Sequence, residues 1–336
     1  MLKVAVIGLG TVSIVHIRGI QASAMADLVA VCDIDSSKAD LVPDATFYTD
    51  YKTMLAEEDL DVVHVCLPHY LHDTVTLDVA KKGIHVLCEK PVSVNYERSK
   101  ALADAVDELN NGVKVAICFQ NRLNASVIEL KRILTEEDTS GIIAVKGLVA
   151  WYRGPEYYAE KPWRGTIKEA GSGTIINQSI HTLDLLHYVM DAEWTDVRAS
   201  VHNILDYDIE VEDSANANFT FSNGAHGLFY ATNAYYGNDS VELQVVTNKS
   251  RYTIKDNKLF DDDWHCLAED AKIPDSKIYY GPGHQDCMEE FYTAITANTD
   301  KYCSIRDALP TMQMIDAMKA SSATQTRIYK EAFLNG

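Results

Sequence analysis

Glu89, Lys90 and Pro91 follow a short apolar run and are the residues in this sequence best suited to chemistry. Proline disfavours a helical backbone in the residue before it, so Lys90 should leave the strand end extended. A lysine in that position holds a substrate oxygen and moves a proton while a cofactor takes a hydride. Composition alone favours the simpler alternative, a solvated ion pair between Glu89 and Lys90.

A glycine-rich turn near the N-terminus is a second motif with chemical meaning. It follows an apolar run and opens a helical pattern, which is the context of a dinucleotide-binding turn. Gly8 permits the tight turn, Gly10 lets a pyrophosphate approach the helix start, and Ser13 replaces the usual third glycine. The alternative is an ordinary strand–helix turn. We expect the cofactor to contact Gly8, Gly10, Thr11 and Val12.

The choice of cofactor depends on Asp33, which ends the second apolar run. An acid at this distance from the turn accepts hydrogen bonds from the ribose hydroxyls. A carboxylate would repel the 2′-phosphate of NADP, so Asp33 favours NAD. Lys38 is the one nearby cation that keeps NADP open.

A third motif runs from Gly171 to Leu186 and combines a glycine cluster with an amphipathic helical pattern. Asn177 and His181 should share one face of that helix. Asp184 is placed to orient the His181 imidazole, and a histidine with such a partner serves as an acid or base. The alternative is that His181 is a hydrogen-bonded core histidine.

Aromatic and arginine residues cluster just before that motif, in segments 151–158 and 161–165. Aromatic rings suit sugar rings, and guanidinium groups suit carboxylates or phosphates. A surface loop or a subunit contact would use the same residues. The predicted substrate contacts are Arg153, Tyr158, Trp163, Arg164, Asn177 and, at the domain junction, Arg122.

Bulk composition excludes several functions. The chain has 336 residues, 47% hydrophobic, with a formal net charge of -19, which disfavours binding to nucleic acid or anionic membranes. Seven cysteines occur without a CxxC pair, so buried free thiols are expected.

His16 is a candidate for approaching the cofactor, while His64 and His85 lie in apolar runs and look structural. No sequence spacing suggests a metal. No signal peptide or membrane-length run is seen, and we expect a cytoplasmic protein.

The order of elements predicts two domains. Apolar strands at 4–7, 28–32, 62–67, 84–88 and 113–119 alternate with helices at 12–22, 71–82 and 96–109. Such buried strands indicate a parallel sheet covered on both faces. Beyond residue 120, the alternating stretches 213–221 and 225–234 flank Asn223-Gly224, and short strands at 241–246 and 251–255 follow. Helical patterns at 285–297 and 305–329 close the chain. We therefore assign residues 1–120 to a dinucleotide-binding domain and 121–336 to a substrate-binding and oligomerisation domain.

These motifs, in this order, resemble the Gfo/Idh/MocA oxidoreductases, which include glucose–fructose oxidoreductase and inositol 2-dehydrogenase. The segments 68–72 and 85–91 are especially specific to that family. The resemblance implies an α/β protein, with an N-terminal Rossmann domain and a C-terminal domain built on an open, mainly antiparallel sheet. It implies Lys90 as the catalytic lysine and His181 as the second proton-handling group. It places Leu67, Pro68, His69, His72, Glu89 and Lys90 around the cofactor.

The chain departs from the family pattern at Asn177, where several members have aspartate. An amide cannot take a proton, so Asn177 would orient the substrate or His181, and Lys90 or His181 would be the base. The N-terminal export signal and arm of glucose–fructose oxidoreductase are also missing, which argues against a periplasmic enzyme with permanently bound NADP.

We therefore expect an NAD-dependent dehydrogenase, with NADP as the less favoured cofactor, acting on a secondary alcohol of a sugar, sugar derivative or cyclitol. Two alternatives remain open. One is an NAD-dependent glycosidase on the same scaffold, and the other is a dinucleotide-binding regulator without chemistry. The resemblance implies a homodimer or homotetramer that buries the open sheet face.

Overall fold

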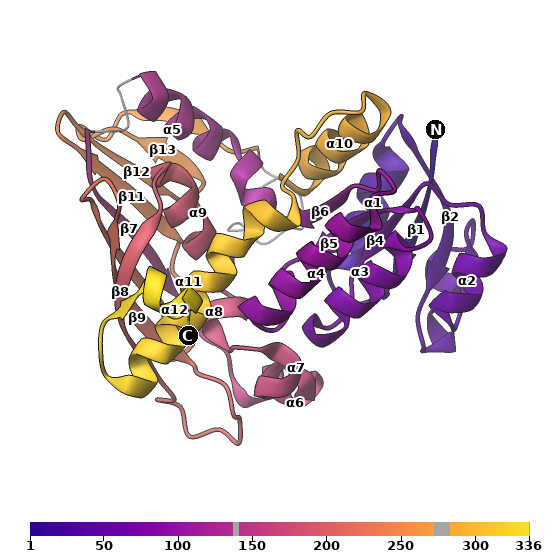
Figure 1. Ribbon diagram of the computed structural model, residues 1–336, viewed down its shortest axis with the longest axis horizontal. Helices are drawn as coiled ribbons and strands as arrows, with labels where there is room; N and C mark the ends of the chain where they lie inside the picture. Colours follow the sequence, from indigo (N-terminus) through magenta and orange to yellow (C-terminus); the bar gives the residue numbers. More distant parts are fainter. Residues whose placement is uncertain (137–140, 272–282, 336) are drawn as a thin grey trace. The chain divides into compact units, whose positions relative to one another are not determined.

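The computed structural model describes residues 1–136, 141–271 and 283–335 (Figure 1). The chain divides into two compact units. The first contains Met1–Gln120 and His284–Leu309, and the second contains Asn121–Gly283 and Pro310–Gly336. Within the described ranges, no helix combines the length and apolar character needed to cross a bilayer.

The first unit is built on a parallel sheet of six strands in the order β3-β2-β1-β4-β5-β6. The order reverses between β1 and β4, as in a Rossmann fold. The predicted parallel sheet is thus confirmed, and its central strands are buried along most of their length. The strands are β1 (Leu2–Ile7), β2 (Ala26–Cys32), β3 (Thr46–Tyr48), β4 (Val62–Val65), β5 (His85–Glu89) and β6 (Val115–Cys118).

Helices connect these strands in chain order: α1 (Ser13–Ala22), α2 (Tyr51–Glu57), α3 (His72–Ala80) and α4 (Tyr96–Leu109). Asn95 starts α4 because its side chain accepts a hydrogen bond from the Arg98 N–H, and Asn110 ends it in a left-handed conformation. The short elements β3 and α2 had no clear pattern in the sequence. Cys32, Cys66, Cys88 and Cys118 are buried free thiols, as expected.

The chain returns to the first unit through α10 (Gly283–Thr296). A Cβ atom added to Gly19 on α1 would come within 2.3 Å of the Met288 side chain on α10. The Ile117 N–H on β6 donates to the carbonyl oxygen of Cys303. The division predicted at residue 120 did not include this return, because it depends on packing between segments far apart in the sequence.

The second unit contains a sheet of nine strands in the order β14-β13-β12-β11-β7-β10-β9-β8-β15. Only β7 and β10 pair in parallel among these described strands, so the sheet is mainly antiparallel, as predicted. The strands are β7 (Ile142–Ala150), β8 (Trp194–His202), β9 (Ser214–Phe221), β10 (His226–Thr232), β11 (Glu242–Thr247), β12 (Arg251–Lys255), β13 (Lys258–Phe260), β14 (Cys266–Glu269) and β15 (Ile328–Tyr329).

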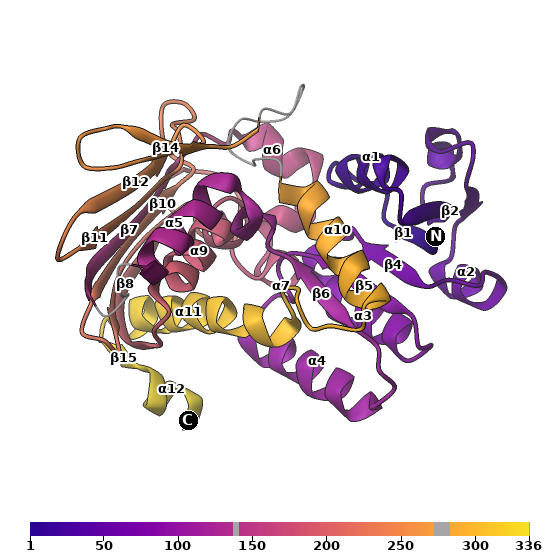
Figure 2. The same cartoon turned by 90° about the horizontal axis from the view of Figure 1, so that it is seen from above.

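One face of this sheet is covered by helices. On β9 the predicted alternation holds, because Ala215, Ala217 and Phe219 are buried while Asn216 and Asn218 are exposed. Figure 2 shows α5 (Ala125–Glu136), α9 (Ile180–Met190) and α11 (Ile305–Thr324) on the covered side. The remaining helices of the unit are α6 (Pro155–Glu160), α7 (Ile167–Ala170), α8 (Thr174–Asn177) and α12 (Lys330–Asn335).

The last long helix is shorter than predicted. The sequence pattern predicted a helix to residue 329, but α11 ends at Thr324. Gln325 has a φ of 55°, a left-handed conformation that stops a helix, and the Ser321 hydroxyl donates to the Thr326 carbonyl. Ile328 and Tyr329 are then free to pair with β8 as strand β15.

Candidate functional site

The glycine-rich turn joins β1 to α1 in the geometry expected of a phosphate-binding turn. Gly8 has a φ of +94°, and a Cβ there would lie 2.5 Å from the Cys66 carbonyl oxygen, so only glycine fits. A Cβ on Gly10 would meet no atom within 4 Å, which leaves its backbone open to a ligand. The buried Ser13 hydroxyl donates to the Gly10 carbonyl, so the turn uses the hydroxymethyl group that replaces the third glycine.

Asp33 closes the other side of this turn. Its carboxylate accepts hydrogen bonds from the N–H groups of Leu9 and Asp35, at 2.8 and 2.9 Å, and from the Lys38 ammonium at 2.8 Å. Burial opposes ionisation of Asp33, but Lys38 and the two N–H donors outweigh it and hold the pKa below its ordinary value. The structure thus presents an ionised acid beside the turn, as a ribose-binding residue requires.

A cavity of about 250 Å³ lies beside the turn, in the first unit. It is lined by Leu9, Gly10, Ser13, Ile14, Ile17, Arg18, Gln21 and Leu41. Because no atom lies within 4 Å of a Cβ placed on Gly10, a ligand can reach the start of α1 there. The residues present therefore fit a dinucleotide at this turn.

The His72 ring hydrogen-bonds two backbone carbonyl groups, one on each side of the neighbouring loop. Its Nδ1 lies 2.7 Å from the Pro91 carbonyl oxygen, and its Nε2 lies 2.7 Å from the Leu67 carbonyl oxygen. Carbonyl oxygens only accept, so both ring nitrogens carry hydrogen and the ring is cationic. Burial opposes that charge, but Cys88 and the two carbonyls outweigh it and raise the pKa of His72 to about 9. His72 thereby fixes Leu67 and Pro91, two segments that the resemblance places at the cofactor.

The remaining residues predicted to contact the cofactor follow the central strands β1 and β4. Leu67 and Pro68 follow β4 and are partly buried, while His69 is buried and packs edge-on against His72. Thr11 is exposed, and Val12 precedes the first residue of α1.

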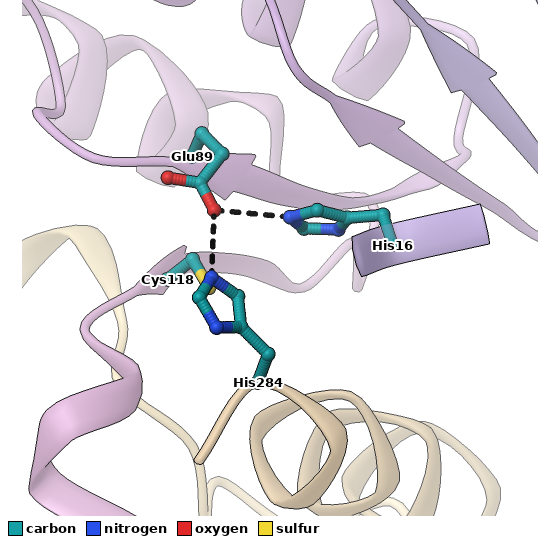
Figure 3. A group of neighbouring side chains, drawn as sticks. All are labelled: His16, Glu89, Cys118 and His284. Carbon is teal, nitrogen blue, oxygen red and sulfur yellow. Dashed lines mark hydrogen bonds and ion pairs between the residues drawn. The ribbon is translucent and has the colours of Figure 1, made fainter. Parts of the chain in front are cut away.

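Glu89 is buried at the end of β5, between two histidines (Figure 3). Its Oε1 lies 3.0 Å from the His16 Nε2 and 3.6 Å from the His284 Nε2. Its Oε2 accepts the backbone N–H of Lys90 at 3.2 Å. Burial opposes ionisation, but the two histidines outweigh it and hold the pKa of the Glu89 carboxyl well below its ordinary value.

A chain of hydrogen bonds continues behind His16. The Nδ1 atoms of His16 and His64 are 2.9 Å apart, and the His64 Nε2 lies 3.0 Å from the Tyr292 hydroxyl. Burial and the neighbouring His16 lower the pKa of His64 well below its ordinary value, so its ring is neutral. The structural role expected for His64 is observed. His16, which was expected near the cofactor, points instead to this buried chain.

Lys90 lies at the carboxyl end of β5, where its backbone is held by the Glu89 carboxylate and its peptide bond to Pro91 is cis. It is half-buried. Burial lowers the pKa of the Lys90 ammonium, and the nearby Glu89 and Cys118 only partly oppose that effect. Lys90 is therefore not fully solvated, in contrast to what composition alone would favour.

In the second unit, the predicted continuous helix around Asn177 and His181 is broken in two. Helix α8 ends at Asn177, and α9 begins at Ile180. The break occurs because the Ser179 hydroxyl bonds the carbonyl oxygens of Thr174 and Ile175, which competes with helical pairing. The argument that Asn177 and His181 share one helix face is thus wrong. His181 lies buried in the first turn of α9.

Asp184 does not orient His181, contrary to expectation. Its carboxylate binds Arg122 at 2.8 and 2.6 Å and the Thr311 hydroxyl at 2.9 Å. The Arg122 guanidinium also lies 4.8 Å from the centre of the Tyr188 ring. The structure places Arg122, a predicted substrate contact, in this buried ion pair.

The glycine cluster before α8 serves packing. A Cβ on Gly173 would lie 1.9 Å from the Glu212 carbonyl oxygen. Glycine is therefore required here by the nearby Glu212 backbone and not by a ligand. The buried Glu212 carboxylate accepts hydrogen bonds from the Ser172 hydroxyl and the Ile175 N–H, at 2.8 and 3.0 Å. We predicted that this glycine cluster lets a ligand approach the start of the helix. The structure instead shows the Glu212 backbone in the space beside Gly173.

The aromatic segment presents Tyr157 between two arginines. The guanidinium carbons of Arg164 and Arg153 lie 4.2 and 5.7 Å from the centre of its ring. The Tyr157 hydroxyl accepts a hydrogen bond from Gln178, the residue after Asn177, at 3.0 Å. Tyr157 thus connects the arginines to the α8–α9 break, and sequence reasoning overlooked it.

The neighbouring Tyr158, which was predicted to contact substrate, is buried in a small core with Ala170 and Val211. Its hydroxyl lies 3.2 Å from the Asn233 side chain. Trp163 is half-buried and packs against the same core. In a helical segment adjacent residues point in different directions, and the sequence did not reveal which tyrosine is the more deeply buried.

Comparison with known proteins agrees with this geometry. A model of an oxidoreductase family with an NAD-binding Rossmann fold matches residues 2–117, and a model of the GFO/IDH/MocA C-terminal domain matches residues 127–253. The uncharacterised oxidoreductase YrbE of Bacillus subtilis is 25% identical over 95% of this chain and 93% of its own length.

Two further proteins are informative. D-glucoside 3-dehydrogenase of Escherichia coli is 32% identical, but over 56% of this chain and 54% of the enzyme, so the match spans about half of that relative. The WlbA dehydrogenase from Bordetella pertussis, solved with NADH and UDP-GlcNAcA, is 25% identical and superimposes with a TM-score of 0.85 over 98% of both chains.

Both halves of the chain thus match the same family, and the Gly8–Ser13 turn and Asp33 have the geometry that its cofactor needs. The chain belongs to the Gfo/Idh/MocA oxidoreductases, and its first unit is an NAD-binding Rossmann domain.

Proposed function

We propose that this protein is an NAD-dependent dehydrogenase that oxidises a secondary alcohol of a sugar, sugar derivative or cyclitol. The observation that carries the proposal is Lys90, a lysine with a lowered pKa at the end of β5 in an NAD-binding sheet. In such sheets ligands bind beyond the carboxyl ends of the strands. The similarity to D-glucoside 3-dehydrogenase supports the substrate class.

NAD, when bound, accepts the hydride from the alcohol carbon. The protein must then remove the hydroxyl proton, and the neutral amine of Lys90 is suited to accept it. His181 is the second group proposed to hold a proton at the reacting oxygen. Asn177 has an amide side chain, which orients a hydroxyl or the His181 ring but takes no proton.

Replacing Lys90 with alanine should lower kcat by about 100- to 10,000-fold, the usual contribution of a general base. NAD binding, followed by titration of protein fluorescence, should persist, because the turn and Asp33 are intact. The control is Lys82→Ala, an exposed lysine after α3, which should retain full turnover of a sugar and polyol panel read by NADH absorbance. Normal turnover by the Lys90→Ala protein would remove this lysine from the mechanism.

The pH profile gives an independent test. Only the neutral amine accepts a proton, so oxidation should accelerate as pH rises through the Lys90 pKa and then level off. Because burial lowers that pKa, the plateau should begin below the ordinary value of 10.5. Lys90→Arg keeps a permanent charge and should lose the rising limb.

The substrate side of the proposal rests on Arg153 and Arg164. Both guanidinium groups lie over the Tyr157 ring, with their central carbons 5.7 and 4.2 Å from its centre. The Arg153 Nη1 donates to the Tyr152 carbonyl and the Asn238 side chain, and the Arg164 Nη1 donates to the Tyr157 carbonyl. Their other donors suit a carboxylate or phosphate on a sugar. The similarity to WlbA, solved with a nucleotide-linked sugar acid, supports this substrate feature.

Arg164→Met should therefore lower kcat/KM for an anionic sugar by about 10- to 100-fold, the loss of one charge-assisted contact. The neutral counterpart of that sugar should be affected little. Arg132→Met is the matched control, because Arg132 lies on α5 and pairs with Glu129 and Glu136. Equal losses on charged and neutral sugars would assign Arg164 to packing and not to anion recognition.

Asp33 is proposed to select NAD over NADP. Asp33→Ser removes the ribose acceptor and leaves Lys38 without its carboxylate partner. The KM for NAD should rise by about 10- to 100-fold, while the KM for NADP falls. Asp40→Asn, an exposed carboxylate nearby, is the control. Steady-state kinetics with both cofactors would contradict the assignment if the preference stayed unchanged.

We also propose that the exposed face of the nine-stranded sheet binds a second copy of the chain. Leu228 and Tyr230 on β10 point away from the helices and are 42% and 39% exposed. A shallow groove of about 230 Å³ lies on the strands around Leu228. Exposed apolar side chains on an open sheet are the usual basis of subunit contacts.

Leu228→Asp combined with Tyr230→Asp should dissociate the oligomer, because an aspartate buried at an interface lacks a partner. Sedimentation velocity would show a smaller species than the parent protein. Ile128→Asp, on helix α5 over the opposite face, should leave the assembly unchanged. A monomeric parent protein would end this part of the proposal.

A further inference from the structure

A buried group of four side chains in the first unit takes up no proton or hydride in the proposed reaction. It consists of His16 from α1, Glu89 from β5, Cys118 from β6 and His284 from α10. One ligand-type atom of each residue lies within 4.8 Å of all the others. Figure 3 shows the four side chains converging on one point.

We propose that these four residues form a Zn²⁺ site that fastens α10 to the Rossmann sheet. The donor set is two imidazole nitrogens, one sulfur and one carboxylate oxygen. Zinc accepts all three donor types and takes four ligands in structural sites. Harder ions such as Mg²⁺ or Ca²⁺ prefer oxygen donors alone.

The spacing suits a tetrahedral zinc. Zinc–ligand bonds of about 2.0–2.3 Å place neighbouring ligand atoms about 3.3–3.8 Å apart. The Glu89 Oε1 is 3.0 Å from His16 and 3.6 Å from His284. All four ligand atoms lie within 4.8 Å of one another, so binding draws the more distant pairs about 1 Å closer.

Charge balance favours a divalent ion here. The Glu89 carboxylate and a Cys118 thiolate together neutralise Zn²⁺, so no net charge is buried. A cysteine ligand loses its proton when the cation binds, as in other metal sites.

The hydrogen bonds that the four side chains make to their neighbours are of the kind that orients zinc ligands in proteins. A metal on the His16 Nε2 leaves its Nδ1–H to donate to His64, whose Nε2–H then donates to the Tyr292 hydroxyl. The second oxygen of Glu89 is held by the Lys90 N–H.

The competing explanation is a carboxylate hydrogen-bonded by two histidines, without metal. That arrangement accounts for His16, Glu89 and His284, and leaves Cys118 as a buried thiol whose sulfur lies 3.9 Å from the Gln120 side-chain oxygen. The thiol is the residue that distinguishes the two explanations.

The test uses the full-length protein after removal of metals with a chelator. Titration with Co²⁺, a spectroscopic substitute for zinc, should show one equivalent bound. A thiolate-to-cobalt charge-transfer band and the strong visible bands of a tetrahedral site should appear. Cys118→Ser should abolish the charge-transfer band, and Zn²⁺ should raise the Tm of the parent protein but not of this variant.

The matched control changes a histidine and a cysteine in an exposed group, where metal binding would be unspecific. Asp261, His265 and Cys266 lie together on the surface of the second unit, with 3.1 Å between His265 and Asp261. The double variant His265→Asn/Cys266→Ser should keep the full cobalt spectrum. Loss of the band in this variant, with retention in Cys118→Ser, would overturn the proposal.

X-ray absorption of the zinc-loaded parent protein keeps the test independent of how Cys118→Ser folds. One sulfur and three nitrogen or oxygen neighbours are expected. An all-oxygen shell, or failure of the parent protein to bind one equivalent of zinc or cobalt, would also overturn the site.

Discussion

The burial of a single carboxylate constrains the first unit more than any other interaction. Glu89 is 5% exposed and ionised, and an unpaired buried charge of that kind would cost several kcal/mol. Its compensation comes from His16 on α1 and His284 on α10, at opposite ends of the sequence. The chain must therefore return after the second unit to complete the first, which explains why residues 284–309 belong to the Rossmann unit.

Sequence reasoning succeeded where the physical cause is local. The Gly8–Ser13 turn, Asp33 at the end of β2 and the alternation along β9 all depend on neighbouring residues, so the sequence reveals them. The same holds for α4, whose boundaries follow from Asn95 and Asn110. Cofactor class and fold were predictable for this reason, because a dinucleotide-binding turn combines several local requirements in one short segment.

It failed where a specific side-chain contact, usually with a residue far away in the sequence, overrides the local pattern. The helix around Asn177 is broken by the Ser179 hydroxyl, and Asp184 prefers Arg122 and Thr311 to the histidine one turn away. Tyr157 and Tyr158 look equivalent in the sequence, yet Asn233 and the core fix Tyr158 inside. The link from His64 to Tyr292 has no sequence signature, because nothing in either segment indicates the other.

Different interactions fix the position of Lys90 and set the pKa of its ammonium group. The Glu89 carboxylate holds the Lys90 N–H, and the cationic His72 holds the Pro91 carbonyl, so the backbone is fixed on both sides of the lysine. A neutral imidazole could donate to only one of the two carbonyls, so the His72 charge is part of the anchor. The lowered pKa of Lys90 comes mainly from burial of its own side chain. The proposed base is therefore placed before a substrate arrives, and a change in its pKa need not move it.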